Sequence, residues 1–225
     1  MSIKRIGVLT SGGDAPGMNA AIRAVTRAGI CNGFNIKGIY RGFDGLINGE
    51  VKPFTTENVS GIIMQGGTIL KSARSKEFMT EEGQKKAVST CKFLGLDSII
   101  AIGGDGTFRG ATDLTFHGVP SIGMPATIDN DITATDYTIG FDSAMNTTVT
   151  MLDCLRDTCE SHARCNVVEV MGRDCGQIAL MTGIASGALA VCIPEIPFDE
   201  QAAIERIKQA KATGKRGSYV CFYMI

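Results

Sequence analysis

The sequence lacks an excess of charge of one sign and a long apolar run, and each absence excludes a class of protein. Its formal net charge is −1, so it offers no broad basic face for nucleic acid and no polybasic segment for a membrane surface. No apolar run approaches the roughly 20 residues that span a bilayer, and residues 1–5 lead into a strand pattern without the apolar core of a signal peptide. We therefore expect a cytoplasmic globular protein that binds neither nucleic acid nor membrane.

The C-x-x-C spacing that is typical of metal and redox sites is also absent from the eight cysteines. Several of them lie in apolar helical or strand patterns, which favours reduced, buried thiols over disulfides or a zinc site. The histidines, His117 and His162, have no partner at motif spacing, and we assign neither a catalytic role.

Short apolar runs alternate with helix-length periodic segments, and Gly or Pro marks nearly every junction. This alternation predicts an α/β fold that is doubly wound, with mostly parallel sheets and helices on both faces. The long helical segment after Gly140 predicts a crossing into a second domain, so we expect domains at 1–139 and 140–225. Strands are expected at 6–9, 36–40, 98–102, 121–124, 167–170, 190–193 and 218–222, and helices at 17–29, 81–94, 108–116, 141–162 and 199–212.

Two glycine-rich loops each follow an expected strand and precede an expected helix. The loop from Thr10 to Gly17 carries two adjacent glycines, which let backbone amides approach a phosphate; an ordinary tight turn explains it equally well. The loop from Gly103 to Thr107 embeds Asp105 among three glycines, a position that favours Mg²⁺ beside phosphates over a simple turn. Both loops lie where ligands bind in doubly wound sheets.

Two common kinase schemes are excluded. Residues 66–72 resemble a P-loop superficially, but the Walker A pattern requires Gly before its Lys, and this chain has Leu70 before Lys71. The H-R-D and D-F-G signatures of protein kinases are absent as well.

A pair of carboxylates, Asp129 and Asp131, follows the strand expected to end near Met124. In extended backbone the two side chains project from one side, and like charges held together favour a cation site or proton transfer over a solvated turn. One carboxylate would then accept a proton from an attacking hydroxyl during phosphoryl transfer.

Arginines supply candidate phosphate ligands. Arg173 follows the strand at 167–170, where a guanidinium suits a phosphate clamp; pairing with Asp174 on the surface is the alternative. Arg164 precedes the same strand. Arg23 and Arg27 lie one helical turn apart and would bridge an anion or simply be solvated.

Taken in order, the motifs resemble those of bacterial ATP-dependent 6-phosphofructokinases across nearly the whole chain, although 103–107 alone also resembles NAD kinases and lipid kinases. The resemblance implies MgATP-dependent phosphorylation of fructose 6-phosphate at its 1-hydroxyl, giving fructose 1,6-bisphosphate for glycolysis in an allosteric homotetramer. It also implies an ATP- and Mg²⁺-binding first domain and an incomplete sugar-phosphate domain. The motifs are Leu9–Asn19, Ile102–Thr107, Pro125–Asp131, Asp136–Phe141 and Val168–Arg173.

The resemblance also assigns roles to individual residues. Asp129 would be the general base and Asp105 the Mg²⁺ ligand, while Thr127 and Arg173 would stabilise the transferring phosphoryl group. Gly106 and Ala126 favour ATP over pyrophosphate as donor. The ATP contacts would be Gly13, Arg74, Ser75, Gly104, Asp105, Gly106 and Thr107; the fructose 6-phosphate contacts would be Thr127, Ile128, Asp129, Met171, Gly172 and Arg173, with Arg164 reaching a neighbouring subunit's sugar.

The chain departs from the family pattern at several points. Its effector residues would be Arg23, Arg27, Arg156 and Lys215, but Thr56 and Leu189 replace two further effector contacts. Lys71 stands where relatives usually have Gly, and Met224 where they have a substrate-binding Glu. Relatives are also about a hundred residues longer. The alternative to an active enzyme is therefore a catalytically incomplete nucleotide-binding fragment or regulatory paralogue. A different small-molecule kinase, such as one for NAD, is a further alternative.

Overall fold

The computed structural model describes residues 3–162, 164–213 and 218–223. The backbone divides into two compact units: an N-terminal unit of residues 1–127 and 131–140, and a C-terminal unit of residues 128–130 and 141–225.

The N-terminal unit is built on a six-stranded sheet whose order is β3-β2-β1-β4-β5-β6. All neighbouring strands are parallel except β3, which runs antiparallel to β2 at one edge. The central strands are short apolar runs, as expected for parallel strands buried on both faces. The strands are β1 (Arg5–Ser11), β2 (Asn35–Ile39), β3 (Val51–Pro53), β4 (Ser98–Gly103), β5 (Ser121–Thr127) and β6 (Ile139–Gly140).

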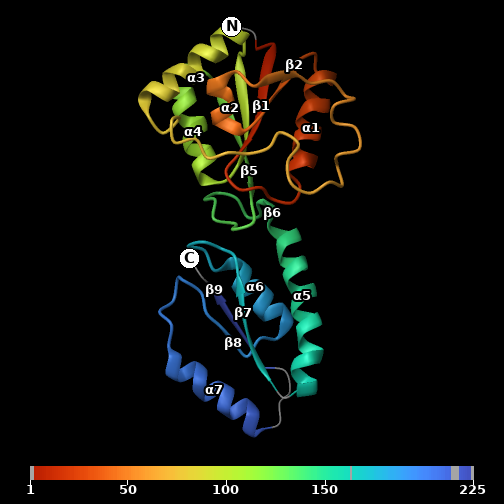
Figure 1. The fold of residues 1–225 in the computed structure, drawn as a ribbon, viewed down its shortest axis with the longest axis vertical. Helices are drawn as coiled ribbons and strands as arrows, with labels where there is room; N and C mark the ends of the chain where they lie inside the picture. The colour runs from red at the N-terminus through yellow and green to blue at the C-terminus, as the bar shows by residue number, and fades with distance from the viewer. Residues whose placement is uncertain (1–2, 163, 214–217, 224–225) are drawn as a thin grey trace. The chain divides into compact units, whose positions relative to one another are not determined.

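Helices cover both faces of this sheet. Leu9, Ile99 and Ala101 form one apolar core with buried residues of the second, third and fourth helices, and Figure 1 shows the first helix on the other side of the strands. Thr80 caps the third helix by accepting a hydrogen bond from the Gly83 amide at 3.1 Å, and left-handed Gly95 ends it. The helices are α1 (Met18–Cys31), α2 (Gly42–Asn48), α3 (Glu81–Leu94) and α4 (Asp105–Phe116).

The strand order reverses between β1 and β4. The chain runs from β1 outward to β2, then returns to place β4 on the other side of β1. In doubly wound sheets this reversal opens a crevice at the carboxyl ends of the two strands, where ligands bind. The loops that leave β1 and β4 are the two glycine-rich loops.

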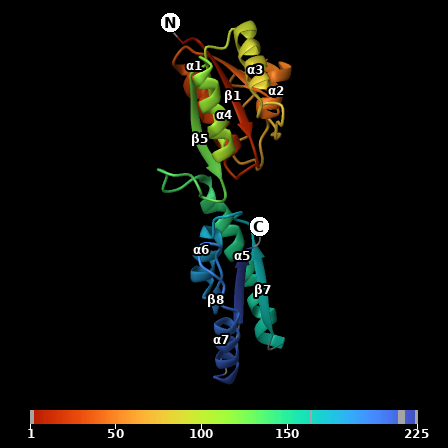
Figure 2. The ribbon, with the colours of Figure 1, turned by 90° about the vertical axis from the view of Figure 1, so that its left-hand side faces the viewer.

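The C-terminal unit contains a three-stranded parallel sheet of order β7-β9-β8, visible in Figure 2. Val167 on the edge strand β7 is 63% exposed, although parallel strands are ordinarily covered on both faces. No helix in the described ranges is long and apolar enough to cross a membrane. The elements are α5 (Phe141–His162), β7 (Cys165–Val170), α6 (Gln177–Ser186), β8 (Ala190–Val191), α7 (Glu200–Ala212) and β9 (Ser218–Tyr223).

The doubly wound, mostly parallel fold predicted from the sequence is confirmed, and each strand and helix predicted from the pattern is present within a few residues. Four short elements were missed, namely α2, β3, β6 and α6. Helix α2 has two glycines in seven residues, which lowers its helix propensity, and burial of Phe43 and Leu46 stabilises it instead.

Cysteine reactivity provides a test of this packing. Burial raises the pKa of the Cys91 thiol to about 11, so about one thiol in a thousand is ionised at pH 8. Iodoacetamide at pH 8 is therefore expected to label exposed Cys31 and Cys154 in the folded protein and to leave buried Cys91 unlabelled until urea unfolds the chain. Peptide mass spectrometry measures each site; rapid labelling of Cys91 in the folded state would contradict the packing of α3.

Candidate active site

The two glycine-rich loops are joined where β1 and β4 end. Ser11 and Gly103 are register partners, and the buried Thr107 hydroxyl donates a hydrogen bond to the Ser11 carbonyl oxygen at 3.0 Å. A Cβ on Gly103 would lie 2.3 Å from Thr107 Oγ1 and 2.5 Å from the Ser11 oxygen, so only glycine fits. The sequence located both loops, and the structure brings them together.

The N-terminus of α4 faces this junction. The N-cap residue is Gly104, which has no side chain with which to cap the positive helix terminus. Gly13 and Gly106 have no heavy atom within 4 Å of the position of a Cβ, which leaves room for a ligand to approach the backbone. Glycine loops of this kind, at the start of a helix, suit phosphate binding.

Asp105 is the first residue of α4. Its carboxylate is 41% exposed and pairs with Arg109 one turn later, with Arg109 Nη2 2.8 Å from Asp105 Oδ2. An exposed ion pair of this kind stabilises the fold by only about 0–1 kcal/mol, so the carboxylate can exchange Arg109 for a cation at little cost.

Residues 65–71 lie against the carboxyl end of β1. Buried Asn19 donates to the carbonyl oxygens of Gln65 and Gly66 and accepts from the Ile69 amide at 2.7 Å. The Thr10 hydroxyl donates to the Lys71 carbonyl oxygen at 2.8 Å. No helix follows this segment before α3, so the strand–loop–helix arrangement of a P-loop is missing, consistent with the rejection of a Walker A site.

Arg74 and Ser75 follow on the same segment. Arg74 is exposed, whereas the Ser75 hydroxyl accepts a hydrogen bond from the Phe78 amide at 3.2 Å and lies 3.5 Å from Asp44 of α2. Phe78 stacks on Phe43 with ring centroids 4.2 Å apart. A Cβ on Gly110 of α4 would lie 2.6 Å from Phe43 and 3.1 Å from Phe78. This aromatic pair therefore packs the segment against α4, the helix that begins with Asp105.

Lys71 adopts a left-handed backbone with φ 59°, a conformation that costs a non-glycine residue roughly 1–2 kcal/mol. Replacing Lys71 with glycine removes this cost, but the larger entropy of glycine in the unfolded chain offsets part of the gain. Lys71→Gly is therefore expected to raise the free energy of unfolding by roughly 0.5–1 kcal/mol. Urea denaturation measures this. Lys76→Gly is the matched control, because Lys76 has no positive φ and the change is expected to destabilise. An unchanged ATP affinity in Lys71→Gly would show that its ammonium group is solvated.

Thr127 ends β5 beside the α4 loop. A Cβ on Gly104 would lie 3.6 Å from the Thr127 Cβ, and the Thr127 carbonyl oxygen accepts a hydrogen bond from the buried Thr138 hydroxyl at 2.6 Å. The pairing of Thr127 with Gly140 in β6 holds the end of the strand in place.

The backbone of the carboxylate pair differs from the prediction. We expected an extended segment, but β5 ends at Thr127, residues 128–129 form a bend, and Asn130 is left-handed with φ 54°. The strand alternation that would point Asp129 and Asp131 to one side is therefore wrong. Asn130 is among the residues that tolerate this conformation best, and its side-chain Nδ2 donates a hydrogen bond at 3.3 Å to the side-chain oxygen Oε1 of Gln177, the first residue of α6.

The loop after β7 carries the predicted sugar-phosphate residues. Met171 is exposed, Gly172 is buried, and Arg173 is left-handed with φ 53°. Arg173 Nε lies 3.9 Å from the exposed Asp174 carboxylate, a weak solvated contact that an anion can displace. Strained backbone of this kind concentrates at functional sites.

Arg164 lies at the opposite end of β7, directly before Cys165, where its amide donates to the Cys159 carbonyl oxygen. At about 3.3 Å per residue, the six residues of β7 separate Arg164 from the Met171–Arg173 loop by roughly 20 Å. The structure therefore does not bring Arg164 and Arg173 together within one chain.

The predicted effector residues make local contacts in their own units. Arg23 donates to the Val59 carbonyl oxygen at 3.0 Å, and Arg27 is exposed one turn later. Arg156 donates to the Ser186 carbonyl oxygen and lies 3.4 Å from Asp153. Lys215 and Met224 lie outside the described residues.

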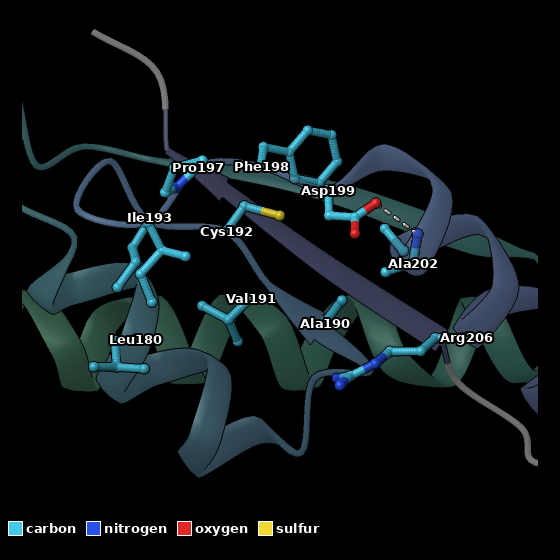
Figure 3. Close-up of a pocket in the computed structure, with 12 residues that line it drawn as sticks. Leu180, Ala190, Val191, Cys192, Ile193, Pro197, Phe198, Asp199, Ala202 and Arg206 are labelled. Atoms are coloured by element: carbon cyan, nitrogen blue, oxygen red, sulfur yellow. Dashed lines mark hydrogen bonds between the residues drawn. The ribbon is translucent and has the colours of Figure 1, made fainter.

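An apolar cavity of about 320 Å³ lies in the C-terminal unit between the loop after β8 and α7 (Figure 3). Leu180, Ile193 and Phe198 contribute to its walls, and none of its lining residues is among the predicted site residues. No sequence pattern marked this cavity, because its lining comes from α6, from β8 with the loop after it, and from α7, which are apart in the sequence.

A family model described as phosphofructokinase matches residues 5–223. An ATP-dependent 6-phosphofructokinase of Clostridium tetani is 55% identical over 95% of this chain and 67% of its own length, and one of Lactobacillus acidophilus is 57% identical over the same shares. A phosphofructokinase structure from Saccharomyces cerevisiae superposes with a TM-score of 0.90 at 37% identity, covering 98% of this chain and 33% of that chain.

The chain thus spans about two thirds of the length of the curated relatives and a third of the yeast chain. Because the family model covers almost every residue, and because relatives more than half identical carry one name, the resemblance drawn from the motifs is confirmed: this chain belongs to the phosphofructokinase family.

Proposed function

We propose that this chain transfers the terminal phosphoryl group of ATP to the 1-hydroxyl of fructose 6-phosphate, giving fructose 1,6-bisphosphate and ADP in cytoplasmic glycolysis. The observation that carries the proposal is the junction at the sheet reversal, where the Thr107–Ser11 hydrogen bond joins two glycine loops at the N-terminus of α4. Phosphates bind favourably at such a terminus. Gly106 and Ala126 support ATP as the donor.

Asp105 suits a single-carboxylate Mg²⁺ site. No group of three or more His, Cys, Asp or Glu in the described part of the chain could hold a metal, so the ion would take its other ligands from phosphate oxygens and water, as Mg²⁺ commonly does. When bound, Mg²⁺ neutralises charge on the phosphates. Asp105 would be its protein ligand.

The chemistry then needs few side chains. Asp129 accepts the proton of the sugar 1-hydroxyl while the oxygen of that hydroxyl attacks the phosphoryl group. Arg173 and Thr127 donate hydrogen bonds to the phosphoryl oxygens, where negative charge is spread in the transition state. Arg74, Ser75 and Gly13 contact ATP, and Met171 and Gly172 line the sugar site.

The resemblance to the family adds a homotetramer to the proposal, and the roughly 20 Å along β7 between Arg164 and Arg173 supports the participation of a second subunit. A neighbouring subunit is the simplest way for Arg164 to reach a sugar phosphate. Exposed apolar side chains on α5 and β7, including Met151 at 60% and Val167 at 63%, support coverage by another surface.

A coupled assay with fructose 6-phosphate and MgATP tests the activity. We expect turnover with ATP, none without the sugar phosphate, and none with pyrophosphate as donor. The second candidate is a nucleotide-binding fragment or regulatory paralogue, favoured by the chain spanning two thirds of its relatives. ATP binding without turnover would reject the enzyme and support that alternative; turnover of NAD alone would indicate a different kinase.

A further inference from the structure

The N-terminus of α6 is linked to two segments that carry residues of the proposed reaction. Arg173 is four residues before Gln177, the first residue of the helix, and Asn130, the neighbour of Asp129, contacts Gln177 through its side chain at 3.3 Å. All of these residues belong to the C-terminal unit. The first turn of α6 therefore connects the loop that carries Arg173 with the segment that carries Asp129.

This helix start is held from a distance. Gly176, the N-cap of α6, has no side chain with which to cap the helix, and its amide donates a hydrogen bond to Glu195 Oε1 at 2.8 Å. A carboxylate at a helix N-terminus satisfies an amide that lacks a partner within the helix and interacts favourably with the helix dipole. Glu195 acts from 19 residues away in the sequence.

Packing around Gly176 is tight. A Cβ at this position would lie 2.4 Å from the Ile193 Cβ and 2.7 Å from Glu195 Oε2, so the segment 193–195 lies directly on the Gly176 backbone. A hydrogen bond from the Ile196 amide to the Ile193 carbonyl oxygen closes the turn that presents Glu195. The Cys175 amide donates to the Gly172 carbonyl oxygen at 2.9 Å, which ties the braced end of the loop to the residue before Arg173.

From these contacts we infer that Glu195 is a positioning residue, which fixes the Gly172–Gly176 loop so that left-handed Arg173 meets the transferring phosphoryl group. The inference rests on the proposed function for Arg173. Glu195 acts through the Gly176 amide and does not itself touch substrate. Its partner in this role is Gln177, which holds the segment beside Asp129.

Steady-state kinetics of Glu195→Ala and Glu195→Gln test the role. Glu195→Ala removes the acceptor, and we expect kcat/KM for fructose 6-phosphate to fall on the order of 10- to 100-fold with MgATP affinity unchanged, because small displacements of positioning groups have effects of this size. Glu195→Gln retains a carbonyl oxygen as acceptor and is expected to restore most of the loss.

Asp199→Ala is the matched control. The Asp199 carboxylate also caps a helix, accepting from the Ala202 amide at 3.0 Å, but α7 carries none of the proposed catalytic residues (Figure 3). We expect Asp199→Ala to lower thermal stability without changing kcat/KM. Equal losses in Glu195→Ala and Asp199→Ala, or no rescue by Glu195→Gln, would overturn the inference.

Hydrogen exchange separates this inference from the proposed function. Amides 172–177 are expected to exchange faster in Glu195→Ala than in the unchanged chain, and not in Glu195→Gln or Asp199→Ala. Absence of turnover in the unchanged chain would reject the proposed function. Hydrogen exchange would still test whether Glu195 holds the Gly172–Gly176 loop in place. Unaltered exchange in Glu195→Ala would show that Glu195 does not hold the loop.

Discussion

Replacing Asp129 with Ser is expected to lower turnover on the order of 10²–10⁴-fold, the usual effect of losing a general base. The proposed role of Asp129 is to take the proton of the sugar hydroxyl, and Asp129 is not among the proposed ATP contacts. MgATP affinity should therefore be unchanged. The measurement is kcat in the coupled assay beside the dissociation constant of MgATP from calorimetry.

Asp129→Asn and Asp131→Ser complete this test. Asp129→Asn keeps the size of the side chain and removes its basicity, so it should lose nearly as much turnover as Asp129→Ser. Asp131→Ser removes the other carboxylate of the pair and should lose less. Unchanged turnover in both Asp129 variants would refute the assignment, and a large fall in Asp131→Ser alone would transfer the role to Asp131.

Among the glycine-to-alanine substitutions in the two glycine-rich loops, Gly103→Ala is expected to be the most destabilising. The added Cβ would press on Thr107 Oγ1 and on the Ser11 carbonyl oxygen, and it would displace the buried hydrogen bond between them. Overpacking and an unsatisfied buried carbonyl each cost about 1–3 kcal/mol, so the free energy of unfolding should fall by about 2–6 kcal/mol. Urea denaturation measures the loss.

Gly106→Ala is the matched control, since no heavy atom lies within 4 Å of its Cβ position. Gly106 is the second residue of α4, and alanine favours a helix by up to about 1 kcal/mol over glycine, so this variant should be at least as stable as the unchanged chain. The added methyl should nevertheless weaken MgATP binding if phosphates approach this backbone. A Gly103→Ala protein as stable as Gly106→Ala would contradict the packing described here.

Much of the fold could be predicted because its signals are local. The apolar runs of β1 and β4, each followed by a glycine loop and a periodic helix, predict strand, loop and helix from neighbouring residues alone. Helix α6 was missed because it is apolar on all sides, so no period of 3.6 marks it. Helix α2 was missed because tertiary burial of Phe43 overrides its glycines.

The candidate site divides in the same way. The residue types and their order indicated phosphate binding, a metal carboxylate and a base, because each depends on side-chain chemistry carried by a short segment. The bend at Asp129 could not be predicted, because the left-handed Asn130 breaks an alternation that assumes extended backbone. Nor could the contact of Glu195 with Gly176, since no local pattern links residues 19 positions apart.

The sequence by itself determined the family, the strand–loop–helix order and the identity of the glycine loops, because backbone freedom and apolar periodicity are properties of adjacent residues. Only the tertiary structure decided which loops meet. Parallel pairing of β1 with β4 places Ser11 beside Gly103, and the fold of the C-terminal unit places Glu195 on the start of α6. Such contacts depend on how distant segments pack, and that packing depends on all the elements of a unit together and not on neighbouring residues alone.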